Sequence, residues 1–335
     1  MFFEVKQLNK SFGDKALLKN ISFGAEKGDI LSFVGPSGVG KTTLLKMIAG
    51  LEQPDSGEIL FTTRHNGKNP AVMVFQNFML FPNMTVYDNI AFGLRAAKTD
   101  KNRIEEKVQE MLECFQIQDK RSQYPKSLSA GQQQRVAIAR AMIISPSILL
   151  LDEPFANLDK NLKAETASFI HHTQKKFKTT TIAVMHDQEE AFRMSDKIGV
   201  ILEGELVQFD TISRVYHEPI SIKAASFLGQ VNILSPEAAG KILIKEDLDF
   251  NTHRYYFRAE AATMSCNSQG KWKITEIVFF GANISYHIKN DNLSVYVNSL
   301  NTHFKAGDTV DLTINKILKE QLDIAGLDHN IGLLG

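Results

Sequence analysis

The sequence predicts an α/β protein in which a mostly parallel, helix-covered sheet is followed by a small all-β domain. Strand-like and helix-like segments alternate to about residue 210, which favours parallel strands joined by crossover helices. A phosphate-loop pattern lies between one such strand and helix. Beyond Val231 the segments are short, strand-like and separated by Gly, Asn and Asp, as expected for a β domain.

Three segments of the first part predict particular elements. Residues 29–34 form a short apolar strand, and 41–49 an amphipathic helix stopped by Gly50. The run 148–151 is continuously apolar, which is typical of a strand buried on both faces. Apolar residues between positions 101 and 118 follow one helical stripe and predict ordinary core packing. They are Ile104, Val108, Met111, Leu112 and Phe115.

The second part predicts five strands and a domain boundary. The strands are 255–259, 271–280, 284–289, 293–297 and 309–314. The helical pattern ends near Pro219, so we expect a short linker at 217–232. The domains are then 1–230 and 231–335, which suits the length of the chain.

Composition and the apolar pattern argue against nucleic acid as a partner, against a secreted disulfide framework and against a spanning helix. The 38 basic and 38 acidic side chains cancel, so no domain-wide basic field favours nucleic acid as a partner. Cys114 and Cys266 lie far apart without C-x-x-C spacing, which fits a reducing compartment. No signal-peptide core occurs at the start, and no apolar run approaches the roughly 18 residues of a spanning helix. We expect a soluble chain that can dock on a membrane protein.

The strongest chemical signal is a G-x-x-x-x-G-K-[ST] phosphate loop placed between a buried strand and a helix. It consists of Gly35, Pro36, Ser37, Gly38, Val39, Gly40, Lys41 and Thr42, with Thr43 next in the helix. Glycines let backbone N–H groups turn toward phosphates, and the helix N-terminus adds its positive dipole end. Lys41 is expected to neutralise β/γ-phosphate charge and Thr42 to ligate Mg²⁺.

A second signal is the acidic pair Asp152-Glu153 at the end of the buried 148–151 strand. Ligands of such sheets bind outside the carboxyl ends of the strands. Asp152 is expected to hold Mg²⁺, directly or through water, and Glu153 to act as general base toward the attacking water. Together with the phosphate loop, the pair predicts a nucleotide hydrolase.

The segment 128–135 predicts a second anion-binding site. Ser129 and Gln132 have the spacing of a capping box at a helix N-terminus, where the positive end of the dipole faces outward. The segment resembles the signature motif of ATP-binding-cassette (ABC) proteins, in which Gly usually stands at the position of Ala130. The resemblance implies that Ser129, Gly131 and Gln132 contact ATP held by a second copy of the chain. It also implies a cassette with a RecA-like parallel-sheet core, an antiparallel β subdomain and a helical subdomain.

Other positions resemble further ABC motifs. Phe12 is similar to the aromatic that stacks on adenine, Gln76 to the Q-loop glutamine near Mg²⁺ and water, and His186 to the switch histidine at the γ-phosphate. The segment 157–159, which ends at Asp159, resembles the D-loop at the dimer interface. Each residue has a structural alternative: Phe12 as core, Gln76 as a loop residue, His186 as an ordinary strand-end histidine. Their joint occurrence in this order favours the family.

The segments 74–76, 81–90 and 186–191 are similar to the importer branch that works with substrate-binding proteins. That resemblance implies a homodimer bound peripherally to permease subunits at the cytoplasmic face of the membrane. It also implies that Phe78, Leu80, Phe81 and Tyr87 lie near a permease helix, although aromatic residues here also suit a core.

The C-terminal segment resembles the small oligomer-binding-like (TOBE-type) barrel of such importer ATPases, with Arg258-Ala259-Glu260 where the family usually has Arg-Pro-Glu. Its role, structural or regulatory, is open.

The alternatives to an importer subunit are a soluble ABC ATPase acting on ribosomes or DNA and an exporter motor. The transported substrate is also open among iron, polyamine, sulfate, molybdate, thiamine and sugar, with a slight preference for iron or polyamine.

Overall fold

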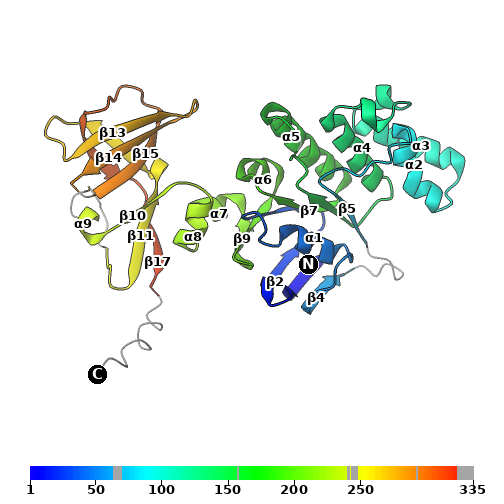
Figure 1. Cartoon of the computed structure of the whole chain (residues 1–335), viewed down its shortest axis with the longest axis horizontal. Coiled ribbons are helices and arrows are strands. Elements are labelled where there is room, and N and C mark those ends of the chain that lie inside the picture. The colour runs from blue at the N-terminus through cyan, green and yellow to red at the C-terminus, as the bar shows by residue number, and fades with distance from the viewer. Residues whose placement is uncertain (63–69, 157, 240–241, 243–247, 292, 323–335) are drawn as a thin grey trace. The chain divides into compact units, whose positions relative to one another are not determined.

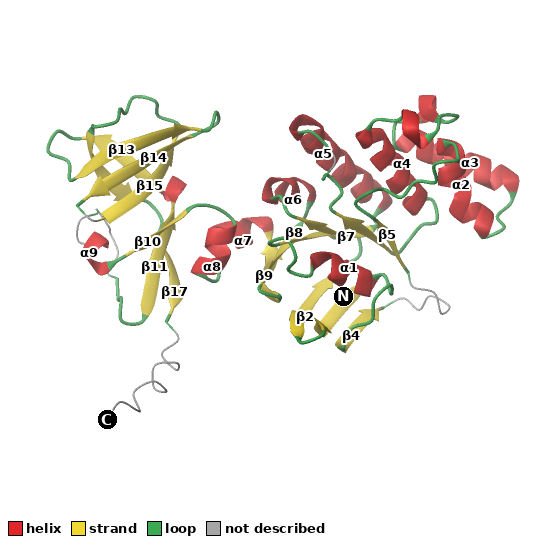
Figure 2. Cartoon of the chain, viewed as in Figure 1, coloured by secondary structure: helices red, strands yellow, loops and turns green. Residues whose placement is uncertain are grey.

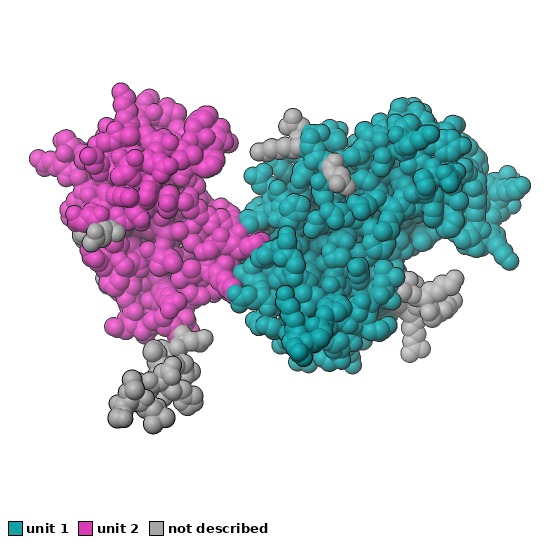
Figure 3. Space-filling model, in the orientation of Figure 1, with its two compact units in different colours: residues 1–215 teal, residues 216–335 magenta. Residues whose placement is uncertain are grey.

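The computed structural model describes residues 1–62, 70–156, 158–239, 242, 248–291 and 293–322. Two compact units, Met1–Val215 and Tyr216–Gly335, are shown in Figure 3. This division falls earlier in the chain than the boundary expected at 230. The segment expected as a linker contains helix α8 (Ile222–Phe227) and the start of strand β10. The first unit is α/β and the second is mainly β (Figure 2).

A six-stranded sheet forms the centre of the first unit, in the order β5-β6-β7-β3-β8-β9. All neighbours are parallel except β8 and β9, so the expected parallel core is confirmed. Its strands are β3 (Ile30–Val34), β5 (Ala71–Val74), β6 (Ile148–Asp152), β7 (Thr180–Met185), β8 (Lys197–Leu202) and β9 (Glu205–Thr211). Every residue of β3, β6 and β7 is buried, as the continuously apolar run 148–151 of β6 predicts for a strand covered on both faces.

Helices cover this sheet (Figure 1). The helix after the phosphate loop, α1 (Lys41–Ile48), packs on β5, β6 and β7, and α6 (Gln188–Met194) packs on β3 and β7. Helix α5 (Lys160–Phe177) begins at its N-cap Asp159 and packs on α6. Two short helices, α7 (Ile212–His217) and α8, follow β9.

An antiparallel sheet with the order β2-β1-β4 packs on the same core. It consists of β1 (Phe3–Phe12), β2 (Lys15–Ala25) and β4 (Ser56–Phe61). The ring of Phe23 in β2 lies 4.5 Å from that of Phe33 in β3, centroid to centroid, a distance typical of packed aromatic pairs. The sheet is therefore joined to the central sheet through buried side chains.

Three helices form a further layer of the first unit. Helix α2 (Val86–Ala96) packs on α3 (Lys101–Cys114) and on α4 (Ala130–Met142). The predicted apolar stripe of α3 is buried, with no residue more than 5% exposed. Ser129 caps α4, and the predicted capping box with Gln132 is formed in both directions.

The second unit contains two antiparallel sheets around one hydrophobic core that includes Trp272 and Tyr286. Their orders are β10-β11-β17 and β12-β16-β13-β14-β15. Helix α9 (Pro236–Ala239) follows β10. The strands are β10 (Val231–Leu234), β11 (His253–Arg258), β12 (Ala262–Cys266), β13 (Trp272–Phe279), β14 (Ile284–Asn290), β15 (Leu293–Ser299), β16 (Thr309–Ile314) and β17 (Leu318–Gln321). The five strands predicted here are thus present to within two residues at each end.

Among the helices in the described ranges, none combines the length and the apolar character needed to cross a bilayer.

Candidate active site

The predicted chemical residues meet at one edge of the central sheet. Gln76 follows β5, Asp152 ends β6, His186 follows β7 and the phosphate loop follows β3. These four strands are consecutive neighbours, and they are parallel to one another. Their carboxyl ends therefore lie together, which is where ligands of open α/β sheets bind.

The phosphate loop depends on its glycines. Gly38 and Gly40 have φ angles of 78° and 106°, a region that other residues rarely adopt. A Cβ on Gly40 would approach Cδ2 of Leu18 to 2.7 Å, and one on Gly35 would collide with the carbonyl oxygen of Ile201. The N-terminus of α1 has no side-chain cap, so its first N–H groups are available for an anion.

Lys41 lies folded against the loop that it follows. Its ammonium group donates to the carbonyl oxygens of Gly35 and Pro36, at 2.7 and 2.9 Å. Burial lowers the pKa of Lys41, and the charges of Glu153 and Asp152 oppose that shift. The cation is thus held at the mouth of the loop with acidic groups nearby.

Thr42 and Asp152 are brought together by α1 and β6. The hydroxyl of Thr42 donates to Oδ1 of Asp152 at 2.8 Å. Burial raises the pKa of Asp152, the hydrogen bond from Thr42 lowers it, and the neighbouring charge of Glu153 raises it. A buried carboxylate beside a hydroxyl gives two hard oxygen donors, the kind that Mg²⁺ prefers.

Glu153 connects the other two predicted catalytic residues. Its Oε2 accepts a hydrogen bond of 3.1 Å from Nε2 of Gln76 and lies 3.6 Å from Nδ1 of His186. The Glu153 backbone has a φ of 45°, a left-handed conformation that costs free energy and often occurs at functional sites. Its N–H donates to the carbonyl oxygen of Val184 at 3.0 Å, which holds the turn after β6 against β7.

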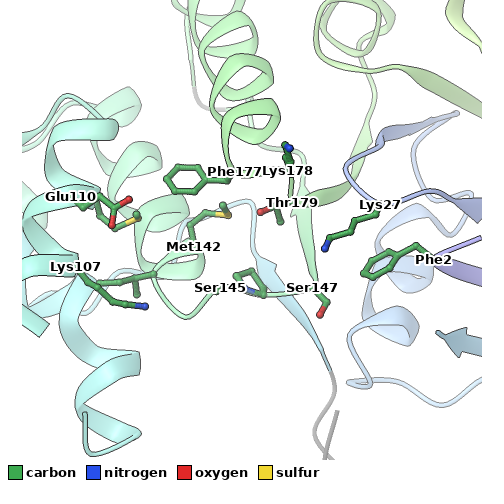
Figure 4. Close-up of a pocket in the computed structure, with 13 residues that line it drawn as sticks. Phe2, Lys27, Lys107, Glu110, Met142, Ser145, Ser147, Phe177, Lys178 and Thr179 are labelled. Atoms are coloured by element: carbon green, nitrogen blue, oxygen red, sulfur yellow. The ribbon is translucent and has the colours of Figure 1, made fainter. Parts of the chain in front are cut away.

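A cleft of about 190 Å³ opens over the phosphate loop. Its lining residues are Leu17, Ser37, Gly38, Gly40, Lys41, Thr42, Thr43 and Glu153. A larger hollow of about 460 Å³, shown in Figure 4, is lined in part by Ser147 and Thr179. These residues immediately precede β6 and β7, so this hollow lies at the amino ends of the strands, away from the predicted catalytic groups.

The residues of the other ABC motifs do not line this cleft. Phe12 lies at the end of β1 with its side chain 55% exposed. Asp159 accepts a hydrogen bond from the N–H of Leu162 at 3.0 Å. A Cβ on Gly131 would meet Cδ2 of that same Leu162 at 3.2 Å, so the signature segment packs beside the start of α5. Asn157 lies outside the described residues.

The aromatic residues expected near a permease differ in exposure. Phe78 is buried, which agrees with the alternative that it belongs to the hydrophobic core. Leu80, Phe81 and Tyr87 are partly exposed. Phe78 and Met79 both have left-handed backbone, with φ of 58° and 44°.

Arg140 is a residue of this region that sequence reasoning missed. Near the end of α4, its guanidinium donates to the carbonyl oxygens of Met79 and Phe78 at 2.8 and 3.0 Å. Its Cζ also lies 5.1 Å from the ring centroid of Phe81. Burial lowers the pKa of Arg140. The helix that starts at Ser129 is thereby tied to the segment that follows Gln76.

Comparison with known proteins agrees with this geometry. Residues 18–156 match the family model described as ABC transporter. The chain is 41% identical over 238 residues to a spermidine/putrescine import ATP-binding protein, PotA, of Thermotoga maritima, covering 70% of this chain and 65% of that protein. It is 39% identical over 278 residues to PotA of Legionella pneumophila, covering 82% and 74% respectively.

A third relative is the sulfate/thiosulfate import ATP-binding protein CysA of Pectobacterium atrosepticum, with 43% identity over 243 residues and coverage of 70% and 74%. The solved structure of cbiO1 from Clostridium perfringens, part of the ABC transporter complex cbiONQ, matches with a TM-score of 0.60 and 29% identity. That match covers 65% of this chain and 91% of the other. The expected fold class and family are therefore confirmed, and the chain belongs to the ABC transporter family as an ATP-binding subunit related to those of importers.

Proposed function

We propose that the chain binds MgATP over the phosphate loop and hydrolyses its β–γ phosphoanhydride bond. Two copies then use this hydrolysis to drive solute import through separate permease subunits. The observation that carries the proposal is the position of Glu153, which contacts both Gln76 and His186 beside Lys41 and Asp152. A carboxylate so placed at the mouth of a phosphate site is suited to accept a proton from water.

Mg²⁺ fits the residues present. Thr42 and Asp152 offer a hydroxyl and a carboxylate oxygen within 2.8 Å of each other. Gln76, whose amide nitrogen is bonded to Glu153, would supply its amide oxygen as a further ligand. Mg²⁺ takes few protein ligands of this kind and completes its shell with water and phosphate oxygens. When bound, the ion would neutralise charge on the β- and γ-phosphates.

Side chains of the protein would carry out the remaining steps of phosphate binding and hydrolysis. Lys41 would leave its loop carbonyls for phosphate oxygens, since a charge-assisted hydrogen bond to phosphate is stronger than one to a neutral carbonyl. Glu153 would accept the proton of the attacking water. Gln76 and His186 would hold that water and the γ-phosphate in line, because catalysis of phosphoryl transfer depends mainly on position and charge.

A second copy would complete the site. Ser129, Gly131 and Gln132 are not among the residues that line the cleft of their own chain, although the N-terminus of α4 is suited to an anion. Asp159 lies beside the same segment through Leu162. We therefore place the signature segment of one copy on the γ-phosphate bound by its partner, in an ATP-dependent homodimer.

The permease contact would use the partly exposed side chains Leu80, Phe81 and Tyr87, which follow Gln76 in the chain. We propose that the protein is a peripheral subunit at the cytoplasmic face of the membrane, in a transporter that receives its solute from a substrate-binding protein. The relatives are named for polyamine, Fe³⁺ and sulfate import, so the proposal is limited to a solute importer.

We propose that the ATP-binding domain ends at residue 230 and that the TOBE-like domain begins at residue 231. The role of the TOBE-like domain stays open.

Affinity isolation tests the transport part of this proposal. The tagged Glu153→Gln variant is extracted from native membranes in mild detergent with MgATP, and the copurifying proteins are identified by mass spectrometry. Lys41→Ala, prepared in parallel, is the control that should not trap the ATP-bound complex. Recovery of a polytopic permease supports import, and recovery of ribosomes or nucleic acid instead would contradict it.

A further inference from the structure

A buried lysine lies next to the predicted adenine-stacking residue. Lys10 is only 8% exposed. Its ammonium group lies 2.8 Å from Oε1 of Glu52 and 3.4 Å from Oδ1 of Asp55, and it donates to the carbonyl oxygen of Gln53 at 2.8 Å. A buried lysine that is paired in this way has a fixed position.

The backbone around Lys10 is attached to the same segment. The N–H of Asp55 donates to the carbonyl oxygen of Asn9 at 2.9 Å. The N–H of Ser11 donates to Oδ2 of Asp55 at 2.6 Å. Residues on both sides of Lys10 are therefore fixed to the turn at 52–55.

That turn is itself an extension of the phosphate-loop helix. After α1 ends at Ile48, the N–H of Leu51 donates to the carbonyl oxygen of Lys46 at 2.8 Å, and that of Glu52 does so at 3.3 Å. The segment 52–55 is thus bonded to the last turn of the helix that begins at the phosphate loop. Lys10 connects the end of β1 to this helix.

Lys10 also contacts Phe12 directly. Its Nζ lies 5.2 Å from the centroid of the Phe12 ring, within the range of a cation–π interaction. Phe12 is 55% exposed, so part of its surface remains open to a planar base. The cation restricts the orientation of an otherwise exposed side chain.

We propose that Lys10, held by Glu52 and Asp55, is a positioning residue for the nucleobase. It fixes the Phe12 ring relative to the phosphate loop, so that adenine and the triphosphate can bind at the same time. Pre-ordering of a ligand-binding side chain improves affinity because less entropy is lost on binding. This inference rests on the proposed function, since it requires ATP in the loop and a base on Phe12.

The experiment compares a ligand with a base and one without. Binding of MgATP and of Mg-tripolyphosphate is measured by calorimetry for the wild type, Lys10→Met, Phe12→Ala and the double variant. Lys10→Met should weaken MgATP binding about three- to tenfold, the usual cost of ordering one side chain on binding, and leave tripolyphosphate binding unchanged. Adding Lys10→Met to Phe12→Ala should cause no further loss, because the ring is already absent.

A general loss of structure in Lys10→Met would weaken the binding of both ligands. Lys10→Met that weakens both ligands equally, or neither, overturns the proposal. Lys10→Arg, which keeps the charge, should restore most of the MgATP affinity, and Asp55→Asn should show a smaller loss confined to MgATP. If MgATP fails to bind the wild type, the proposed function itself fails. If Phe12→Ala binds MgATP like the wild type, the role of Phe12 fails and this inference fails with it.

Discussion

The side-chain amide of Gln76 donates to the carboxylate of Glu153 at 3.1 Å, across 77 positions of the sequence. The two residues follow neighbouring parallel strands, β5 and β6. A glutamine next to the segment proposed to face the permease is therefore in direct contact with the proposed general base. A movement of the 76–81 segment would alter the position of the Glu153 carboxylate, and under the proposed function this would link permease contact to hydrolysis.

Lys41→Ala should weaken MgATP binding by about 1.5 to 3 kcal/mol, the usual contribution of a charge-assisted hydrogen bond. The variant also loses the hydrogen bonds that the ammonium group donates to the carbonyl oxygens of Gly35 and Pro36 in the free protein, so its folding is checked alongside binding. Titration with a fluorescent ATP analogue measures the affinity. Unchanged affinity would refute the phosphate-loop assignment, and circular dichroism checks that the variant is folded.

Asp152→Asn should raise the stability of the nucleotide-free protein at pH 7 while abolishing hydrolysis. The pKa of Asp152 is raised, mainly by burial, so the folded state binds this proton more tightly than the unfolded state. The charged carboxylate therefore destabilises the fold above its folded-state pKa, and the penalty disappears as the pH falls through that value.

Urea unfolding at pH 7.5 and at progressively lower pH measures this effect. The stability advantage of Asp152→Asn over the wild type should shrink as the pH falls toward the ordinary range of aspartate, about 4. A variant that is less stable than the wild type at pH 7.5 would mean that burial is not the dominant influence on this group.

Arg140→Met should loosen the segment after Gln76. It removes two charge-assisted hydrogen bonds to backbone carbonyls and should cost about 1.5 to 3 kcal/mol of stability. Hydrogen–deuterium exchange should increase at residues 76–81 more than in the central sheet. Arg140→Lys, which retains the charge but not the fork of donors, should give a smaller increase. Uniform exchange changes across the first unit would argue against a local role.

Local sequence patterns predicted the elements well where one kind of periodicity dominates. The apolar runs of β3 and β6, the stripe of α3 and the capping box at Ser129 are all present. Helix α8 was missed because it is only six residues long and follows Pro219, which suggested a linker. Phe78 could not be assigned to core or surface, since periodicity gives little information in the irregular segment after β5.

The candidate site was predictable because each of its strands ends in a chemical motif, and parallel strands bring those ends together. Lys10 and Arg140 had no such signal. Their partners lie 43 and about 60 positions away, and a lysine in a strand or an arginine in a helix is normally a solvated side chain. Only the attachment of β1 to the 52–55 turn, and of α4 to the segment after Gln76, gives these residues their partners.

The most direct test of the account is ATP hydrolysis by Glu153→Gln, measured together with its MgATP occupancy in the same preparation. We expect nucleotide to bind at one equivalent per chain and turnover to fall by about 10²- to 10⁴-fold, the usual effect of removing a general base. Filter-binding and single-turnover phosphate release give the two quantities. Wild-type turnover in a variant with full occupancy would contradict the assignment of Glu153 as the group that activates water.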